Sequence, residues 1–250
     1  MVGIFGTRTS LVADAATFLT SALIVRAWVR ARSAPVARAH ADSGSSRRPG
    51  VMAGARLVFA NRVLRTTMLF GWLAAFYNAP EGVVTPLAHI LGGGAATVGV
   101  ILAAAALGET VGALVLSRFV AAPTRLRSMG PLAVATSAVL VLFLWRPDLL
   151  VSLLVLFTSG LCASYQIAAN SAFVSAAPQE QRGQAFGLAQ GGMSLGQGIV
   201  MILAGAAADH HSPARVIAVC GAVGAVVALV IAIGWARERD LPANGRHQRI

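Results

Sequence analysis

Long apolar runs restrict the fold of this chain more than any other feature of its sequence. A helix needs roughly 20 apolar residues to cross about 30 Å of hydrocarbon. Seven runs approach or exceed this length, at residues 10–25, 66–91, 97–119, 130–145, 149–176, 184–208 and 214–235. The fourth run is short and can begin several residues earlier, whereas the second and fifth are long enough to tilt or to contain a break. The sequence therefore predicts an all-α integral membrane protein with seven transmembrane helices.

The composition also indicates that the lipid bilayer is the partner of this chain. Hydrophobic residues make up 56% of it and charged residues 12%, whereas a soluble domain carries about 25% charged residues. The net charge of +11 comes from 20 arginines and no lysine. These arginines lie between the apolar runs, so we expect no nucleic-acid partner. Cys162 and Cys220 lie inside apolar runs without metal-ligand spacing, so we expect no disulfide, metal site or cofactor.

The arginines are distributed unevenly among the segments that join the runs. The polar segment 26–65, two later loops and the tail 237–250 hold seventeen of them, whereas the other side holds Arg146 and Arg215, with Arg8 near the start. The positive-inside rule places the segment 26–65 and the C-terminus in the cytoplasm and the N-terminus outside, as in a protein of the cell membrane. The predicted organisation is a first helix at 1–25, a basic linker at 26–65 that ends in a surface helix (51–65), a six-helix domain at 66–236 and a cytoplasmic tail at 237–250.

An offset of 88 residues aligns similar positions in the second and fifth runs. Tyr77 and Asn78 fall on Tyr165 and Gln166. Matches of this kind arise either from a repeat or by chance in a chain rich in alanine and glycine. A repeat makes the last six helices two copies of a three-helix unit that enter the membrane from opposite sides. Inverted three-helix repeats form many transporter halves, with the substrate site near the middle of the bilayer.

Glu81 lies within the second run, directly after Pro80 and before Gly82. A proline removes a backbone hydrogen bond, and a broken helix at membrane depth is tolerated where it faces protein or a water-filled cavity. An ionisable group at the centre of a span costs about 2.5–3.5 kcal/mol. Two interpretations stay open. Glu81 either faces a cavity, where it carries a proton or pairs with a cationic substrate, or it lies near the outer interface and extends to water.

Other polar residues within the runs have a structural interpretation beside the functional one. Glu109 follows a glycine in a run of small residues, which favour close helix packing, so it either pairs with a neighbouring helix or contributes to binding. Asp14 is expected to cap a helix or to pair with Arg8. Gln190 and Gln197 either add hydrogen bonds to a binding site or form hydrogen bonds between helices, and we expect the second role.

The fifth run provides the strongest prediction of a binding site. Tyr165, Gln166 and Asn170 occupy roughly one broad face of a helix, and buried polar groups in lipid need partners. Since Tyr165 and Gln166 align with Tyr77 and Asn78, the two sets are predicted to meet. Together they are predicted to line a substrate site.

The segment 178–187 reads Pro-Gln-Glu-Gln-Arg-Gly-Gln-Ala-Phe-Gly. It resembles the P-x-E-x-R-G-x-x-F-G loop between helices ten and eleven of major facilitator superfamily transporters. The resemblance implies that Glu180 and Arg182 pair with the cytoplasmic ends of helices. It also implies that Gly183 permits a tight turn into the next helix.

Two further segments carry the resemblance. Residues 14–25 look like the sixth helix of the drug- and macrolide-efflux branches of the family. Residues 112–118, which end in Arg118, are similar to the cytoplasmic gating loop after helix eight, together with Arg125 and Arg127. Ser117 stands where the fullest form of this motif has an acid, so the motif is degenerate.

The resemblance covers essentially the whole chain, as helices six to twelve with the basic linker as the central cytoplasmic loop. It implies a secondary transporter, a proton-coupled antiporter that exports a small amphipathic or drug-like molecule. Helices one to five have no counterpart, so we expect either a wrong start, a truncated gene or a separate chain that supplies them, and no transport by this chain alone. The alternative is a non-transporting remnant, or a half-transporter that acts as a partner or sensor. The motifs of common enzyme sites are not present, so an enzyme is not expected.

Overall fold

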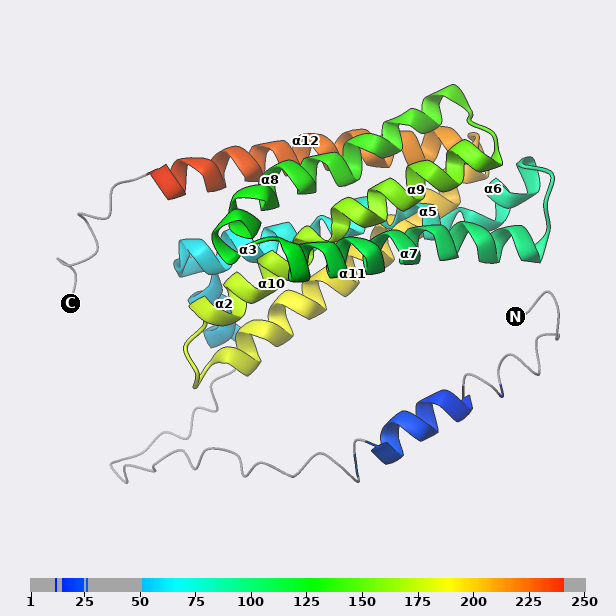
Figure 1. Cartoon of the computed structure of the whole chain (residues 1–250). Coiled ribbons are helices and arrows are strands. Elements are labelled where there is room, and N and C mark those ends of the chain that lie inside the picture. Colours follow the sequence, from blue (N-terminus) through cyan, green and yellow to red (C-terminus); the bar gives the residue numbers. More distant parts are fainter. Residues whose placement is uncertain (1–11, 13–14, 25, 27–50, 241–250) are drawn as a thin grey trace, which may run out of the picture.

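The computed structural model describes residues 12, 15–24, 26 and 51–240, and every regular element in them is a helix (Figure 1). Asp14, Arg8, most of the linker at 26–65 and the end of the tail lie outside the described residues. Five helical stretches of the described part are long and apolar enough to cross a membrane: Ala95–Phe119, Ala122–Trp145, Leu149–Ala176, Arg182–Ala208 and Pro213–Arg237. The last five predicted runs are thereby confirmed as helices of membrane-spanning length.

These five stretches contain seven labelled elements. Their bounds are α7 (Ala95–Phe119), α8 (Ala122–Ala138), the 3-10 helix η1 (Val139–Trp145), α9 (Leu149–Ala163), α10 (Tyr165–Ala176), α11 (Arg182–Ala208) and α12 (Pro213–Asp240). The fourth stretch of the prediction does begin earlier, at Ala122. The fifth contains a break at Ser164, which divides α9 from α10. Both features agree with the expectations from run length.

The second predicted span is divided into four short helices. Their bounds are α3 (Arg62–Trp72), α4 (Ala74–Tyr77), α5 (Ala79–Gly82) and α6 (Val84–Ile90). Pro80 lies in the first turn of α5, where it has no N–H to donate, and Asn78 before it has φ −87° and ψ 0°. The break predicted beside Glu81 is therefore confirmed. The count of seven membrane-spanning helices stays a prediction, because the second run is divided into short helices and the helix described in the first run, Ala15–Ile24, is too short to span a membrane.

The segment predicted as a surface helix at 51–65 contributes to the packed body. It forms α2 (Val51–Ala60) and the start of α3, and the two are separated by Asn61. The Asn61 side chain caps α3 by accepting hydrogen bonds from the Val63 and Leu64 N–H groups at 3.0 and 3.2 Å. Val58 is fully buried in a cluster with residues of α3, α10 and α11. The helical body thus extends to residues before position 66.

Glycines set the closest helix contact of the body, between α7 and α9. A Cβ atom at Gly108 would overlap the Phe157 carbonyl oxygen, and one at Gly160 would overlap the Ala105 carbonyl oxygen. The two backbones therefore touch directly, which only glycine allows at these positions. The expectation that the small residues around Glu109 serve close packing is confirmed.

The connections between helices lie at two opposite ends of the body (Figure 1). One end holds α2, the α7–α8 connection and the α10–α11 connection, with Arg118, Arg125, Arg127 and Arg182. The opposite end holds the turn at Gly92, the connection before α9 and the connection between α11 and α12. The arginine-rich end predicted to be cytoplasmic is thus one physical end of the structure.

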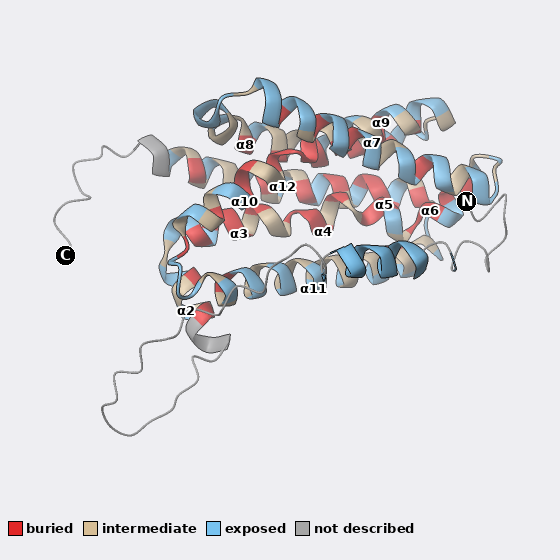
Figure 2. Ribbon diagram, turned by 60° about the horizontal axis from the view of Figure 1, so that its bottom comes forward, coloured by how far each residue is buried: buried red, intermediate tan, exposed pale blue. Residues whose placement is uncertain are grey.

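The long helix α11 lies at the edge of the body and leaves most of its surface uncovered (Figure 2). Its buried residues are Ala185 and Ala204. Trp72 of α3 holds it in place, because its indole Nε1 donates a hydrogen bond of 2.9 Å to the Ala189 carbonyl oxygen. The indole ring also fills the space beside Gly192. One face of α11 is thereby turned toward α3 and α4.

Candidate functional site

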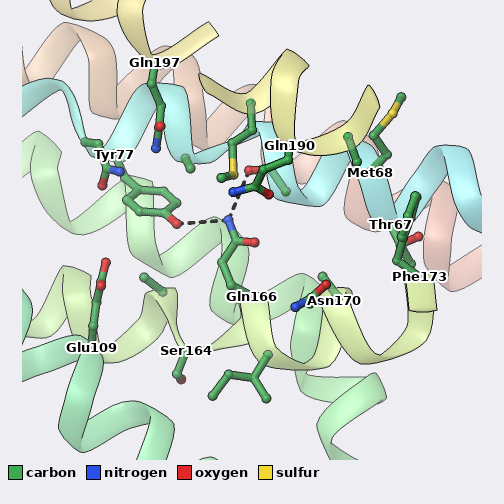
Figure 3. A pocket seen from close by; sticks show the side chains of 18 of the residues that line it. Thr67, Met68, Tyr77, Glu109, Ser164, Gln166, Asn170, Phe173, Gln190 and Gln197 are labelled. Atoms are coloured by element: carbon green, nitrogen blue, oxygen red, sulfur yellow. Dashed lines mark hydrogen bonds between the residues drawn. The ribbon is translucent and has the colours of Figure 1, made fainter. Parts of the chain in front are cut away.

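A cavity of about 460 Å³ lies between α3, α4, α7, α10 and α11 (Figure 3). Volumes of 300–1,000 Å³ are typical of sites for small molecules. Polar side chains enter it from all of these helices: Thr67, Tyr77, Asn78, Glu109, Ser164, Gln166, Asn170, Gln190 and Gln197. Aromatic and methionine side chains complete the lining: Met68, Phe173, Phe186 and Met193. The cavity can therefore contact both the polar and the apolar parts of a ligand.

The break at the end of α3 is satisfied by two side chains of α10. The Tyr165 hydroxyl donates to the Phe70 carbonyl oxygen at 2.9 Å, and the Gln166 Nε2 donates to the Gly71 carbonyl oxygen at 3.1 Å. The last carbonyl groups of a helix have no partner within it, and in a bilayer no water replaces that partner. These two bonds therefore stabilise a helix end at membrane depth.

Tyr77 links this break to the cavity. The Gln166 Nε2 lies 3.1 Å from the Tyr77 hydroxyl oxygen, to which it donates, as Figure 3 shows. The rings of Tyr77 and Tyr165 meet edge to face, with centroids 6.4 Å apart. The predicted convergence of Tyr77 with Tyr165 and Gln166 is therefore confirmed. The inverted repeat from which it was argued stays a prediction.

Tyr165 does not itself line the cavity, in contrast to the expectation from sequence. Its side chain is fully buried, and its ring packs against Phe70 and Tyr77. The other predicted members, Tyr77, Asn78, Gln166 and Asn170, all line it. Tyr165 instead lies behind the wall that Tyr77 and Gln166 form.

Phe186 and Met193, on the face of α11, are lining residues that the sequence did not predict. Phe186, Gln190, Met193 and Gln197 line the cavity, although the glutamines were expected to bond neighbouring helices. Among the described residues, neither glutamine side chain has a hydrogen-bond partner, so both are available to a ligand. The steps of four, three and four residues place these side chains on one face of a helix. This spacing is the signal that would have identified them.

Glu81 and Glu109 both line a small crevice next to the cavity. Glu109 lines both spaces, whereas Glu81 lines only the crevice, together with Tyr77, Asn78 and Ser159. Neither carboxylate forms an ion pair within the described part of the chain, so an electrostatic partner for Glu109 on a neighbouring helix is not found there.

The residues predicted for the cytoplasmic loops lie at the arginine-rich end, away from the glutamates. The Arg182 Nη2 donates to the Ala177 carbonyl oxygen at 3.3 Å, at the end of α10, so the expected contact with a helix end is confirmed for Arg182. The Arg125 Nε donates to the Val120 carbonyl oxygen at 2.9 Å. Arg118, Arg127 and Glu180 are exposed.

The turn before α11 does not depend on Gly183. The turn is closed at residues 178–181, where the Gln181 N–H donates to the Pro178 carbonyl oxygen at 3.1 Å. Gly183 then belongs to the first turn of α11, with ordinary negative φ and open space around it. The expectation that glycine permits a tight turn at this position is wrong.

No group of three or more histidine, cysteine, aspartate or glutamate side chains among the described residues lies close enough to hold a metal ion. Both cysteines are free. The sequence profile of the Major Facilitator Superfamily matches residues 79–249, more than half of the chain, from α5 to beyond α12. No curated protein and no solved structure shows significant similarity to the chain.

Proposed function

The chain belongs to the major facilitator superfamily, whose members are membrane transporters and not enzymes, and on this basis we propose that the cavity between α3, α4, α7, α10 and α11 binds the transported substrate. The substrate is a small amphipathic or drug-like molecule. The transporter that the chain forms, alone or with a partner chain, exports it in exchange for protons, with the arginine-rich end in the cytoplasm.

The observation that carries this proposal is the mixed lining of the cavity. Amide groups of Gln166, Asn170 and Gln190 face the same space as the rings of Phe173 and Phe186. Amides donate and accept hydrogen bonds and carry no net charge, so they hold a polar group of either kind. Aromatic surfaces take up the apolar part of a ligand, and rings also attract a cation. An amphipathic molecule matches this lining better than a sugar or an inorganic ion.

The carboxyl groups support the coupling to protons. Glu109 is the acidic residue of the cavity lining, and Glu81 faces it across the adjoining crevice. A carboxyl group can take up and release a proton, and its loss of charge reduces the cost of its position at membrane depth. A cationic substrate and a proton would therefore compete for Glu109, while Glu81 exchanges the proton with it.

Ligand binding by the purified protein tests the site. Fluorescent amphipathic cations and neutral analogues are titrated against the protein in lipid nanodiscs, and the dissociation constants are measured. We expect Gln190→Ala and Asn170→Ala to weaken binding by about three- to tenfold each, the effect of losing one hydrogen bond. Gln179→Ala, an exposed loop variant, is the control and should bind as the wild type does. Unchanged binding in both cavity variants would show that the substrate binds elsewhere.

Transport in proteoliposomes with a pH gradient distinguishes a transporter from a non-transporting partner or sensor. Uptake or release of the bound compound that follows the gradient supports proton-coupled export. Binding without any movement across the membrane, both for the chain alone and for the chain together with a partner chain that supplies further helices, favours the non-transporting partner or sensor. Cysteines placed at Gly94, where a side chain meets open space, and at Glu180, in a variant without Cys162 and Cys220, test the orientation. An impermeant maleimide applied to intact cells should label only the cysteine at position 94.

A further inference from the structure

A second cavity of about 530 Å³ lies between α11 and α12 and shares no lining residue with the candidate substrate site. Its walls are apolar over most of their length. The lining residues are Phe76, Val200, Leu203, Ala204, Ala207, His211, Arg215, Val216, Val219, Cys220 and Val223. We call this space the α11–α12 groove.

The groove opens sideways, toward the surface of the helical body that the bilayer would cover. Ala204 and Val216 form a buried floor, with exposed fractions of 3% and 7%. Leu203 and Val219 form the walls, with exposed fractions of 62% and 59%. An occupant can therefore enter from the membrane.

The groove is polar at one end only. His211 precedes α12 and Arg215 lies in its first turn, at the end of the body opposite the arginine-rich end. The Arg215 side chain is exposed and forms no ion pair with a described residue, and Asp209, the acidic residue nearest in sequence, does not line the groove. The guanidinium group therefore keeps its capacity to bind an anion. Guanidinium groups pair with phosphate through two parallel hydrogen bonds.

The length of the groove matches half a bilayer. On α12 it extends from Arg215 to Val223, which is about 12 Å at 1.5 Å per residue. One leaflet contributes about 15 Å of the roughly 30 Å hydrocarbon thickness. A molecule with its charge at Arg215 would thus have its apolar part end near the middle of the membrane.

We propose that the α11–α12 groove binds an anionic phospholipid, with an acyl chain along the groove and the phosphate group against Arg215 and His211. This assignment explains both the apolar lining and the unpaired cation at one end. It does not depend on the substrate of the transporter or on transport itself.

Lipid binding by the purified chain tests the proposal. Phosphatidylglycerol and phosphatidylethanolamine with identical acyl chains are titrated into the protein in detergent, and bound lipid is counted by native mass spectrometry. We expect phosphatidylglycerol to bind about fivefold more tightly, the effect of one arginine near a charged headgroup. Arg215→Gln should remove this preference. Arg146→Gln, at an exposed arginine of the same end but outside the groove, should retain it.

A second variant and a second measurement test whether the lipid binds in the α11–α12 groove. Ala207→Phe fills the groove and should weaken the binding of both lipids. In a Cys162→Ser background, phosphatidylglycerol should slow the alkylation of Cys220 by a maleimide, because Cys220 lines the groove. This readout applies whether or not the filled variant folds. The proposal is overturned if the two lipids bind equally to the wild type, if Arg146→Gln removes the preference as Arg215→Gln does, or if Cys220 is protected by an amphipathic substrate and not by the lipid.

Discussion

Gln166 donates one amide nitrogen to two acceptors, the hydroxyl oxygen of Tyr77 and the carbonyl oxygen of Gly71, each at 3.1 Å. The first acceptor belongs to the cavity and the second to the broken end of α3. A single side chain thus stabilises the break and orients the Tyr77 ring that lines the cavity. Stability and binding are therefore expected to change together when Gln166 is replaced.

Comparison of Gln166→Ala with Tyr77→Phe tests this double role. Tyr77→Phe loses only the bond between the two side chains, whereas Gln166→Ala also removes the side-chain donor from the Gly71 carbonyl. Hydrogen bonds between membrane helices contribute about 0.6 kcal/mol on average and up to about 1.7 kcal/mol. We expect Gln166→Ala to lower the thermal unfolding midpoint more than Tyr77→Phe, and both to weaken ligand binding. Equal midpoints in the two variants would show that the Gly71 bond contributes nothing.

Tyr165→Phe tests whether the Tyr165 hydroxyl stabilises the fold without contributing to ligand binding. The substitution removes the hydroxyl that bonds the Phe70 carbonyl but keeps the ring contacts with Phe70 and Tyr77. Because Tyr165 lies behind the cavity wall, we expect a loss of stability of about 0.6–1.7 kcal/mol with little change in ligand affinity. Thermal unfolding in detergent and ligand titration on the same sample measure the two effects. A large loss of affinity with an unchanged midpoint would place Tyr165 in contact with the ligand.

Much of the fold could be predicted because the bilayer permits few solutions. Apolar runs of membrane length must form helices, since no water is present to bond their backbone groups. This argument predicted the five long helical stretches. Pro80 predicted the break beside Glu81, because proline has no N–H to donate to the hydrogen bonds of the helix. The packing of α2 against α11 was not predicted. This packing depends on the contacts of Val58 with residues distant in sequence. A short amphipathic segment has the same sequence pattern whether it packs against protein or lies on a membrane surface.

The candidate site was predicted only in part, for a related reason. The polar residues of the broken second run and of the fifth run were found because polar groups are rare in such runs and need partners. The spacing of Gln190 and Gln197 shows that they share a face, but it does not show what that face meets. The answer depends on Trp72, whose bond to the Ala189 carbonyl fixes the rotation of α11. Tyr165 was placed in the lining because the sequence does not show that its hydroxyl bonds the Phe70 carbonyl at the broken end of α3.

The direct backbone contact between α7 and α9 predicts that substitutions at two glycines of α7 have very different effects on stability. A side chain at Gly108 would overlap the Phe157 backbone, whereas no atom lies within 4 Å of a Cβ at Gly99, on the same helix. Overpacking of a close contact costs about 1–3 kcal/mol. We expect Gly108→Val to lower the unfolding midpoint and Gly99→Val to leave it nearly unchanged. Similar midpoints for the two variants would contradict the observed contact.

Glu81→Gln and Glu109→Gln test the coupling to protons. Glutamine resembles a permanently protonated carboxyl group, so neither variant can exchange a proton with the substrate at that position. We expect each to lose transport that a pH gradient drives, while exchange of labelled for unlabelled substrate across the membrane continues, because that exchange moves no proton. Glu109→Gln should also bind a cationic substrate more weakly than Glu81→Gln does, since only Glu109 lines the cavity.

Glu180→Gln changes an exposed acid at the arginine-rich end and is the matched control. This variant should keep the pH dependence of the wild type. Normal gradient-driven transport in both intramembrane variants would remove these two carboxyl groups from the mechanism and leave the cavity as a binding site without proton coupling.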